Sequence, residues 1–172
     1  MKQTFVVGLV LLMTTAAHAK TVSVTMNKID DKGVGPMIGL LQLEDTKDGL
    51  KITPSLNGLP PGQHGFHVHE KSDCGPADDK GKQTAGMAAG GHLDPKHSGK
   101  HLGPESTEGH SGDLPVLTVD EAGSAKTPVI APHLTVDAVT GHSLMIHAGA
   151  DNYSDQPKPL GGGGGRIACG TL

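Results

Sequence analysis

Gly65-Phe66-His67-Val68-His69 is a short run in which bulky residues and histidines alternate, as they do in a β-strand. The imidazoles of His67 and His69 would project from one face of this strand, and Val68 would project from the other. One metal ion can therefore bind both imidazoles. The run predicts a β-strand that supplies two metal ligands.

Similar short segments lie on both sides of this run. In residues 22–26 and 50–54, apolar and polar residues alternate between turn signals. We expect the other strands at residues 38–43, 63–69, 114–119, 127–131, 142–148 and 166–169. Helical periodicity has almost no support. The spacing of these segments predicts an all-β fold, an antiparallel sandwich.

Two long stretches, residues 70–112 and 151–165, do not have the pattern of strands. Loops of this length inside a compact domain are usually functional or disordered. The first contains Cys74, His92, His101 and His110, so a disulfide and a metal can order it. The second contains five consecutive glycines at residues 161–165, which by composition alone are typical of a flexible linker.

A second set of metal ligands is expected in the first long loop. His92, His101, His110 and Asp113 lie among Gly, Pro, Lys and Asp residues, where no hydrophobic periodicity constrains the backbone and the chain can fold around an ion. Zinc favours tetrahedral sites of imidazole and carboxylate, whereas copper accepts several imidazoles in a flatter arrangement with an open position. The sequence therefore predicts two chemically different metal sites.

Residues 1–19 are typical of a secretory signal peptide. One lysine precedes the apolar run at residues 5–13, and Ala17-His18-Ala19 has the small-x-small form of a cleavage site. The alternative, a transmembrane anchor, needs about 20 apolar residues, and this run is shorter. We expect residues 1–19 to be removed and residues 20–172 to form one exported domain.

Charge and composition exclude some functions. The formal net charge is −4 and aromatic residues are 2% of the chain. A nucleic-acid partner would require a basic stripe with interleaved aromatic residues, which this sequence lacks. The charge does not define the substrate, because bound metals can create a local positive site on an acidic protein.

The two cysteines, Cys74 and Cys169, would both be present after export. An even number of cysteines in an oxidising compartment predicts one disulfide. It would close a loop of nearly a hundred residues, worth on the order of 4 kcal/mol in the chain-entropy model. The alternatives are two free thiols or soft metal ligands, although thiolate zinc sites usually have closely spaced cysteine pairs.

Five fragments, in order along the chain, together resemble the bacterial copper/zinc superoxide dismutases. They are GFHVHE (65–70), GGHLDP (90–95), GHSGDLP (109–115), MIHAG (145–149) and GRIACG (165–170). A set of ordered fragments is far more specific than any one of them. The resemblance implies an eight-stranded antiparallel Greek-key β-barrel, one copper and one zinc ion per subunit, and dismutation of superoxide to dioxygen and hydrogen peroxide in the periplasm.

The resemblance also implies a role for each ligand. The copper ligands would be His67, His69, His92 and His147, and the zinc ligands would be His92, His101, His110 and Asp113. His92 would bridge the two metals and also donate a proton during the reaction. Asp151 matches an outer carboxylate that links His67 to His101, although on its own it would more often be a solvated loop residue.

Arg166 matches a family position beside copper, where a planar guanidinium can orient a small anion. Taken alone, it would be an ordinary arginine at a strand end. Lys82 is the best match to a lysine that steers substrate in bacterial members, and Lys80 is a close rival. His64 resembles a structural histidine, whereas the other histidines of the exported chain have no ligand position in the family and are expected at the surface: His97, His133 and His142.

Three other functions are compatible with parts of this pattern. A catalytically silent copper-binding protein on the same fold would be expected to lose Arg166 or a copper ligand, and neither is lost. A zinc hydrolase would not need the second ligand set or the disulfide. A structural zinc domain would leave His67, His69 and His147 unexplained. The sequence does not distinguish a monomer from a homodimer.

Overall fold

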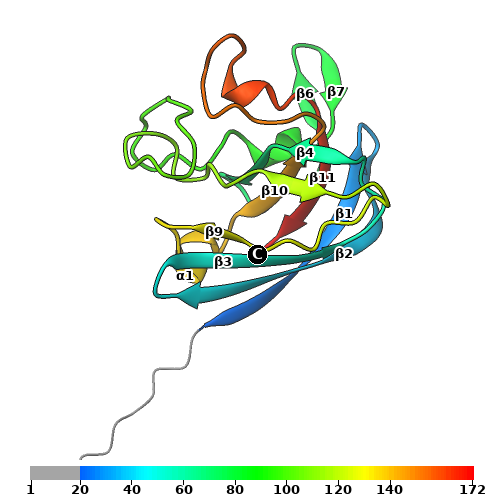
Figure 1. The fold of residues 1–172 in the computed structure, drawn as a ribbon. Coiled ribbons are helices and arrows are strands. Elements are labelled where there is room, and N and C mark those ends of the chain that lie inside the picture. Colours follow the sequence, from blue (N-terminus) through cyan, green and yellow to red (C-terminus); the bar gives the residue numbers. More distant parts are fainter. Residues whose placement is uncertain (1–19) are drawn as a thin grey trace, which may run out of the picture.

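The structure, a computed structural model, describes residues 20–172, and its regular secondary structure is almost entirely β (Figure 1). The predicted signal peptide lies outside the described residues. The strands are β1 (Thr21–Asp30), β2 (Gly33–Thr46), β3 (Gly49–Leu56), β4 (Gly62–His64), β5 (Phe66–His69), β6 (Ala77–Asp79), β7 (Lys82–Thr84), β8 (Leu117–Val119), β9 (Val129–Ala131), β10 (Ser143–His147) and β11 (Arg166–Thr171). The helical elements are short: η1 (Met87–Ala89), α1 (Val136–Val139) and η2 (Leu160–Gly162).

The main sheet has seven strands in the order β5-β10-β11-β1-β2-β3-β9, and every pair in it is antiparallel. It curls around the core, and the separate β4–β8 pair lies between its two edges. β4 runs directly into β5 through Gly65, and the chain after β8 forms an isolated bridge to β3 between Ala125 and Leu56. This arrangement confirms the all-β barrel with antiparallel strands.

Alternation along the strands separates the core from the surface. On β1, Val24 and Met26 are buried, whereas Ser23 and Thr25 between and beside them are exposed. β5 and β10 are buried on both faces. Phe66, Val68, Leu144 and Ile146 belong to the core, and Met145 belongs to a second, smaller cluster with the two cysteines. Loops cover the face that carries the histidines. The histidines are therefore anchored on two buried strands of the barrel.

The eight expected strands are present with changed bounds. Residues 63–69 form two strands, β4 and β5, because the chain turns from one sheet to the other at Gly65. In residues 114–119 and 127–131, strand pairing is restricted to the last three residues of each segment. Strand ends depend on the partner that a segment finds, so local alternation does not fix them.

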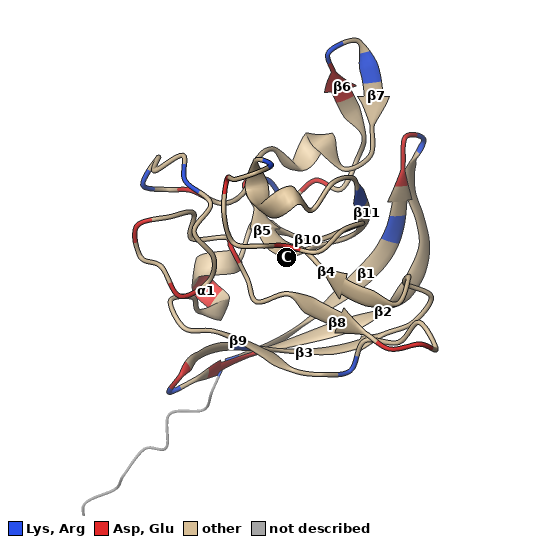
Figure 2. Cartoon of the chain, turned by 45° about the horizontal axis from the view of Figure 1, so that its top comes forward, with Lys and Arg blue, Asp and Glu red and all other residues tan. Residues whose placement is uncertain are grey.

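The expectation that residues 70–112 contain no strand is wrong, because β6 and β7 form a hairpin there. Its two-residue turn, Lys80-Gly81, has positive φ at both positions (56° and 85°), which matches the twist that hairpins favour. Figure 2 shows this hairpin projecting from the barrel with an acidic β6 and a basic residue on β7. Short polar strands and a Lys-Gly turn give a weak sequence signal.

None of the helices within residues 20–172 has both the length and the apolar character that a membrane span requires.

Candidate metal centre

The metal centre lies on the loop-covered face of β5 and β10. His67 and His69 come from β5, and His147 ends β10. An isolated bridge between His69 and His92 brings the first long loop onto β5, and another between His67 and Asp113 brings its end there as well. The two strands thus gather ligands that are far apart in the sequence.

Four buried histidines form the first ligand group: His67, His69, His92 and His147. One ligand nitrogen from each lies within 4.8 Å of the others. His69 Nδ1 donates a hydrogen bond to the Gly90 carbonyl (3.0 Å), and His147 Nδ1 donates to the Gly164 carbonyl (3.1 Å). Each of these bonds leaves Nε2 with its lone pair free to bind a metal.

The second compact group contains His67, His92, His101 and Asp113. It differs in one member from the expected zinc set, because His67 takes the place of His110. The His67 ring stacks on that of His92 with centroids 3.9 Å apart, which explains its proximity. His110 Nδ1 nevertheless lies 3.4 Å from Asp113 Oδ1.

Asp113 is the common partner of the zinc-side histidines. Its Oδ1 lies 2.9 Å from His92 Nδ1, and its Oδ2 lies 2.9 Å from His101 Nδ1. Leu102 and Gly103 also donate backbone hydrogen bonds of 3.2 Å to Oδ2. The carboxylate is therefore fixed at the centre of this group.

Asp151 connects the two ligand groups by binding ring nitrogens that face away from them. Its Oδ2 accepts a hydrogen bond from His67 Nε2 (2.7 Å), and its Oδ1 accepts one from His101 Nε2 (2.8 Å). Both bonds leave the Nδ1 atom of the imidazole to face the ligand group. Tyr153 N donates to Oδ1 as well (2.7 Å), which fixes the carboxylate.

The residues fit a pair of metal ions. Among residues 20–172, seven buried side-chain polar atoms make no hydrogen bond, and six of them are ring nitrogens of these histidines. They are His67 Nδ1, His69 Nε2, His92 Nε2, His101 Nδ1, His110 Nδ1 and His147 Nε2. Burying a polar atom without a partner is costly, so this concentration of unpaired nitrogens indicates cation sites.

The protonation states of two histidines in the first ligand group suit cation binding. Burial lowers the pKa of His92 to about 4 and that of His147 to about 3, so both rings are neutral near pH 7. Burial acts in the same direction on His101, but the adjacent carboxylates of Asp113 and Asp151 outweigh it and raise the pKa of His101 to about 9. Burial would raise the pKa of the Asp113 and Asp151 carboxyls. Their hydrogen bonds with the neighbouring histidines outweigh burial, so the pKa of each carboxyl is lowered.

The glycine run 161–165 packs directly over this centre. Gly149 N donates to the Gly163 carbonyl and Ala148 N donates to the Gly165 carbonyl, each at 2.7 Å. Composition alone suggested a flexible linker, whereas these bonds tie the run to the chain after β10. At Gly161, φ is +68° and an added Cβ would lie 1.8 Å from Asp151 Oδ1, so this position requires glycine.

We predict that Gly161→Ala weakens zinc binding roughly 10- to 100-fold, the range seen when an outer partner of a metal ligand is lost. The new methyl group would displace Asp151 from His101. Gly165→Ala is the matched control, because a Cβ there has no neighbour within 4 Å. Zinc retention against graded chelator measures the effect. Equal retention by both variants would show that the Asp151 contact does not support the site.

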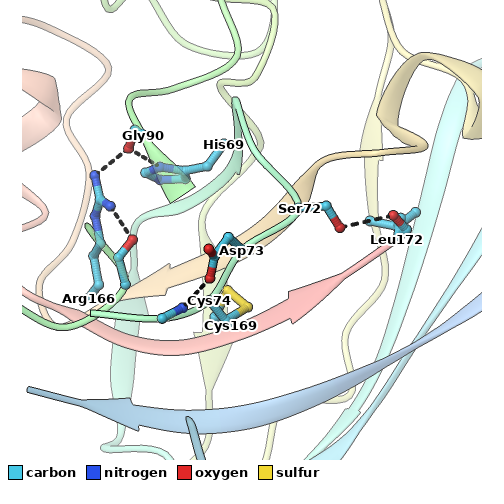
Figure 3. The surroundings of a disulfide bond; sticks show 10 residues. His69, Ser72, Asp73, Cys74, Gly90, Arg166, Cys169 and Leu172 are labelled. Atoms are coloured by element: carbon cyan, nitrogen blue, oxygen red, sulfur yellow. Dashed lines mark hydrogen bonds between the residues drawn. A yellow bond between two sulfur atoms is a disulfide. The ribbon is translucent and has the colours of Figure 1, made fainter. Parts of the chain in front are cut away.

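Arg166 is held beside the first ligand group by two backbone carbonyls (Figure 3). Its Nη1 donates to the Gly86 carbonyl (2.5 Å) and its Nη2 to the Gly90 carbonyl (2.7 Å). The Gly90 carbonyl also accepts the hydrogen bond from His69, so one peptide group orients both side chains.

The predicted disulfide between Cys74 and Cys169 is confirmed, with Cα atoms 5.7 Å apart (Figure 3). It fixes the chain next to Gly75, whose carbonyl accepts a hydrogen bond from Ala88 in η1. Gly86 and Gly90, which flank η1, are the residues that hold Arg166. The disulfide is thus linked to the guanidinium through η1.

A pocket of about 420 Å³ opens beside this arginine. It is lined by Asp79, Thr84, Met87, His92, His147, Pro159, Leu160, Gly164, Gly165 and Arg166. Lys82 is exposed on β7 opposite Asp79 and does not line it, so its steering role remains a prediction. The pocket can admit a small anion to the first ligand group.

The structure also places the remaining histidines. The ring nitrogens of His64 lie 2.7 Å from the His147 carbonyl oxygen and 2.8 Å from that of Pro60, in accord with its expected structural role. Of the three histidines expected at the surface, His97 and His133 are exposed, whereas His142 is half-buried.

Sequence reasoning missed the backbone carbonyls of Gly86, Gly90 and Gly164, which orient Arg166 and two histidines. It also missed Asp155, whose carboxylate accepts hydrogen bonds from the backbone of His101 (3.0 Å) and Leu160 (3.2 Å). A carbonyl belongs to every residue and Asp155 lies in a polar loop, so neither has a sequence signal.

Comparison with known proteins agrees with this geometry. Residues 37–172 match the family described as copper/zinc superoxide dismutase (SODC). Superoxide dismutase [Cu-Zn] 2 of Salmonella typhimurium is 52% identical over 100% of this chain and 99% of its own, and superoxide dismutase [Cu-Zn] of Escherichia coli is 50% identical with the same coverage.

Solved structures show the same similarity. The Cu/Zn superoxide dismutase from Brucella abortus has a TM-score of 0.87 and 44% identity over 89% of this chain and 99% of its own. The monomeric copper, zinc superoxide dismutase from Salmonella enterica has a TM-score of 0.79 and 54% identity over 88% of this chain and 99% of its own.

Proposed function

The chain belongs to the copper/zinc superoxide dismutase family, and on that basis we propose which of its residues carry the family's reaction. Its activity is the dismutation of superoxide, with copper and zinc as cofactors. We assign the copper ligands as His67, His69, His92 and His147, and the zinc ligands as His92, His101, His110 and Asp113.

The observation that carries this proposal is the pair of buried ligand groups that share His92. His92 Nε2 makes no hydrogen bond within the described chain, whereas His92 Nδ1 lies 2.9 Å from Asp113. One imidazole thus presents one nitrogen to each group. This supports His92 as the bridging ligand, because a bridge needs both ring nitrogens.

When bound, copper supplies the one-electron redox chemistry of dismutation. Zinc has no accessible second oxidation state and stabilises the structure of the site. His67, His69 and His147 would hold copper through the ring nitrogen that faces the first ligand group. The other nitrogen of each ring is bound by Asp151, the Gly90 carbonyl or the Gly164 carbonyl. His92 lines the pocket beside Arg166, where its Nε2, when it does not bind copper, could hold a proton and pass it to the reduced product.

Arg166 provides the positive charge of the substrate pocket. The two carbonyls that bind its guanidinium fix its position beside His92 and His147. A fixed cation at this place can attract and orient superoxide, which is a small anion. We therefore propose Arg166 as a catalytic residue and Lys82 as a more remote steering charge.

The test is metal analysis combined with a superoxide assay of the protein loaded with zinc alone and with both metals. We expect one copper and one zinc per chain and activity that depends on copper. Hydrolytic activity with zinc alone would indicate a zinc hydrolase, and bound copper without dismutation would indicate a silent copper-binding protein. Failure to bind copper would leave a structural zinc domain. Each of these results would overturn the proposal.

We further propose that the protein acts in the periplasm of a bacterium. The signal-peptide pattern of residues 1–19 supports this, as do bacterial relatives that match the whole chain. N-terminal sequencing of the exported protein should begin at Lys20. A soluble protein that retains Met1 would contradict the proposal.

A further inference from the structure

We propose that zinc reaches its site through a second pocket, on the His110 side of the centre, and that His133 captures the ion there before it moves inward. The proposal rests on the assignment of His110 and Asp113 as zinc ligands. His133 lies outside both ligand groups, and the sequence predicted it to be an ordinary surface residue. Three observations support a role in zinc uptake.

The first observation is that the two ligand groups open to different pockets. The pocket beside Arg166 is lined by His92 and His147. Among the described residues that line it, His101, His110 and Asp113 are absent. A separate pocket of about 150 Å³ is lined by Lys96, Pro104, Ser106, Thr107, His110, Ser111, Asp113, Ala131, His133 and Leu134. An ion can therefore reach the zinc ligands without passing the copper ligands.

The second observation concerns the exposure of the zinc ligands. The side chains of His101 and Asp113 are 0% exposed and that of His92 is 1% exposed, whereas that of His110 is 9% exposed. His110 Nδ1 is buried and makes no hydrogen bond in the described part of the chain. It is the ligand through which an arriving ion would first contact the site.

The third observation is the placement of His133 at this pocket. Its backbone is fixed on both sides, since Leu134 N donates to the Ala131 carbonyl (3.3 Å) and Val136 N donates to Asp45 Oδ1 (2.7 Å). His133 Nε2 donates to the Glu105 carbonyl (3.2 Å), which ties the ring to the zinc loop. Nδ1 then carries a lone pair, and a neutral imidazole is a good zinc ligand.

The charges at this pocket are those of Lys96 and Asp113. Lys96 opposes a cation, and its ammonium group is held at the Thr107 carbonyl (2.9 Å). Asp113 supplies the negative charge at the inner end. An ion held by His133 can therefore move toward Asp113 and His110 down a favourable gradient.

The test follows zinc uptake by the mature, metal-stripped chain and zinc release from the loaded enzyme to excess chelator. A capture residue on the path lowers the barrier in both directions, so His133→Gln should slow uptake and release by the same several-fold factor and leave the affinity unchanged. A residue that merely stabilised the loop would behave differently, because its loss would speed release. Copper uptake should equal that of the parent, since copper uses the other pocket.

His142→Gln is the matched control. His142 is half-buried and also donates to a backbone carbonyl, that of Glu70 (2.7 Å), but it does not line the zinc-side pocket. This control should load and release zinc at the parent rate. Thr107→Trp, which would narrow the same pocket, should slow zinc exchange and spare copper uptake.

Parent-like zinc uptake by His133→Gln, or faster release, would overturn the inference while leaving the enzyme assignment intact. If the parent chain itself takes up no zinc, or if His110→Ala binds zinc as the parent does, the proposed zinc site fails first. The two failures are therefore distinguishable by the behaviour of the parent and of His110→Ala.

Discussion

Replacing His147 by alanine is expected to reduce the rate of superoxide dismutation by more than about 100-fold, since even the loss of an outer partner of a ligand costs 10- to 100-fold. His147 belongs to the first ligand group and is absent from the second. Its loss should therefore remove copper and leave zinc bound. Metal analysis of the purified variant, together with the superoxide assay, measures both effects.

The complementary variant is His110→Ala, which should lower zinc occupancy and loosen the loop of residues 70–112 while copper still binds. His110 lies at the edge of the zinc group, 3.4 Å from Asp113. Zinc loss in His147→Ala, or unchanged zinc in His110→Ala, would contradict the division of ligands between the two metals. His142→Ala, at a half-buried histidine outside both groups, controls for the loss of an imidazole as such.

Reversing the charge at Arg166 should have the second largest effect. Arg166→Glu should retain both metals but lose activity by about 10- to 100-fold, within the range that electrostatic focusing contributes to association rates. Its carboxylate would face superoxide in the pocket and could not donate to the Gly86 and Gly90 carbonyls. Stopped-flow rates at measured copper content provide the test, and a parent-like rate with full copper would remove Arg166 from the substrate site.

Two milder variants separate geometry from charge. Arg166→Lys should lose less activity than Arg166→Glu, because it keeps the charge but not the planar fork that binds two carbonyls. Lys82→Glu should lower the rate modestly, and the difference from the parent should shrink as salt rises, since screening acts over about 10 Å at 0.1 M. An unchanged rate for Lys82→Glu at low salt would remove only the steering role.

Much of the fold could be predicted because its signals are local. Alternation in residues 22–26 and 50–54 marked β1 and β3, since one face of each strand packs on the core. The hairpin β6–β7 was missed because its strands are short and polar, and its turn depends on two positive φ angles. Local pattern likewise did not show that the chain changes sheets at Gly65.

The sequence by itself determined the donor types and their order along the chain: His67 and His69 on one strand face, the histidines and Asp113 of the loop, His147, and two cysteines for which it predicted one disulfide. These follow from residue chemistry and short-range spacing. The tertiary structure decided which nitrogen of each ring faces the metal, because that depends on Asp151 and on the carbonyls of Gly90 and Gly164. It also opened separate pockets to the two ligand groups. Such contacts join residues that lie tens of positions apart, and only the closed barrel brings them within hydrogen-bonding distance.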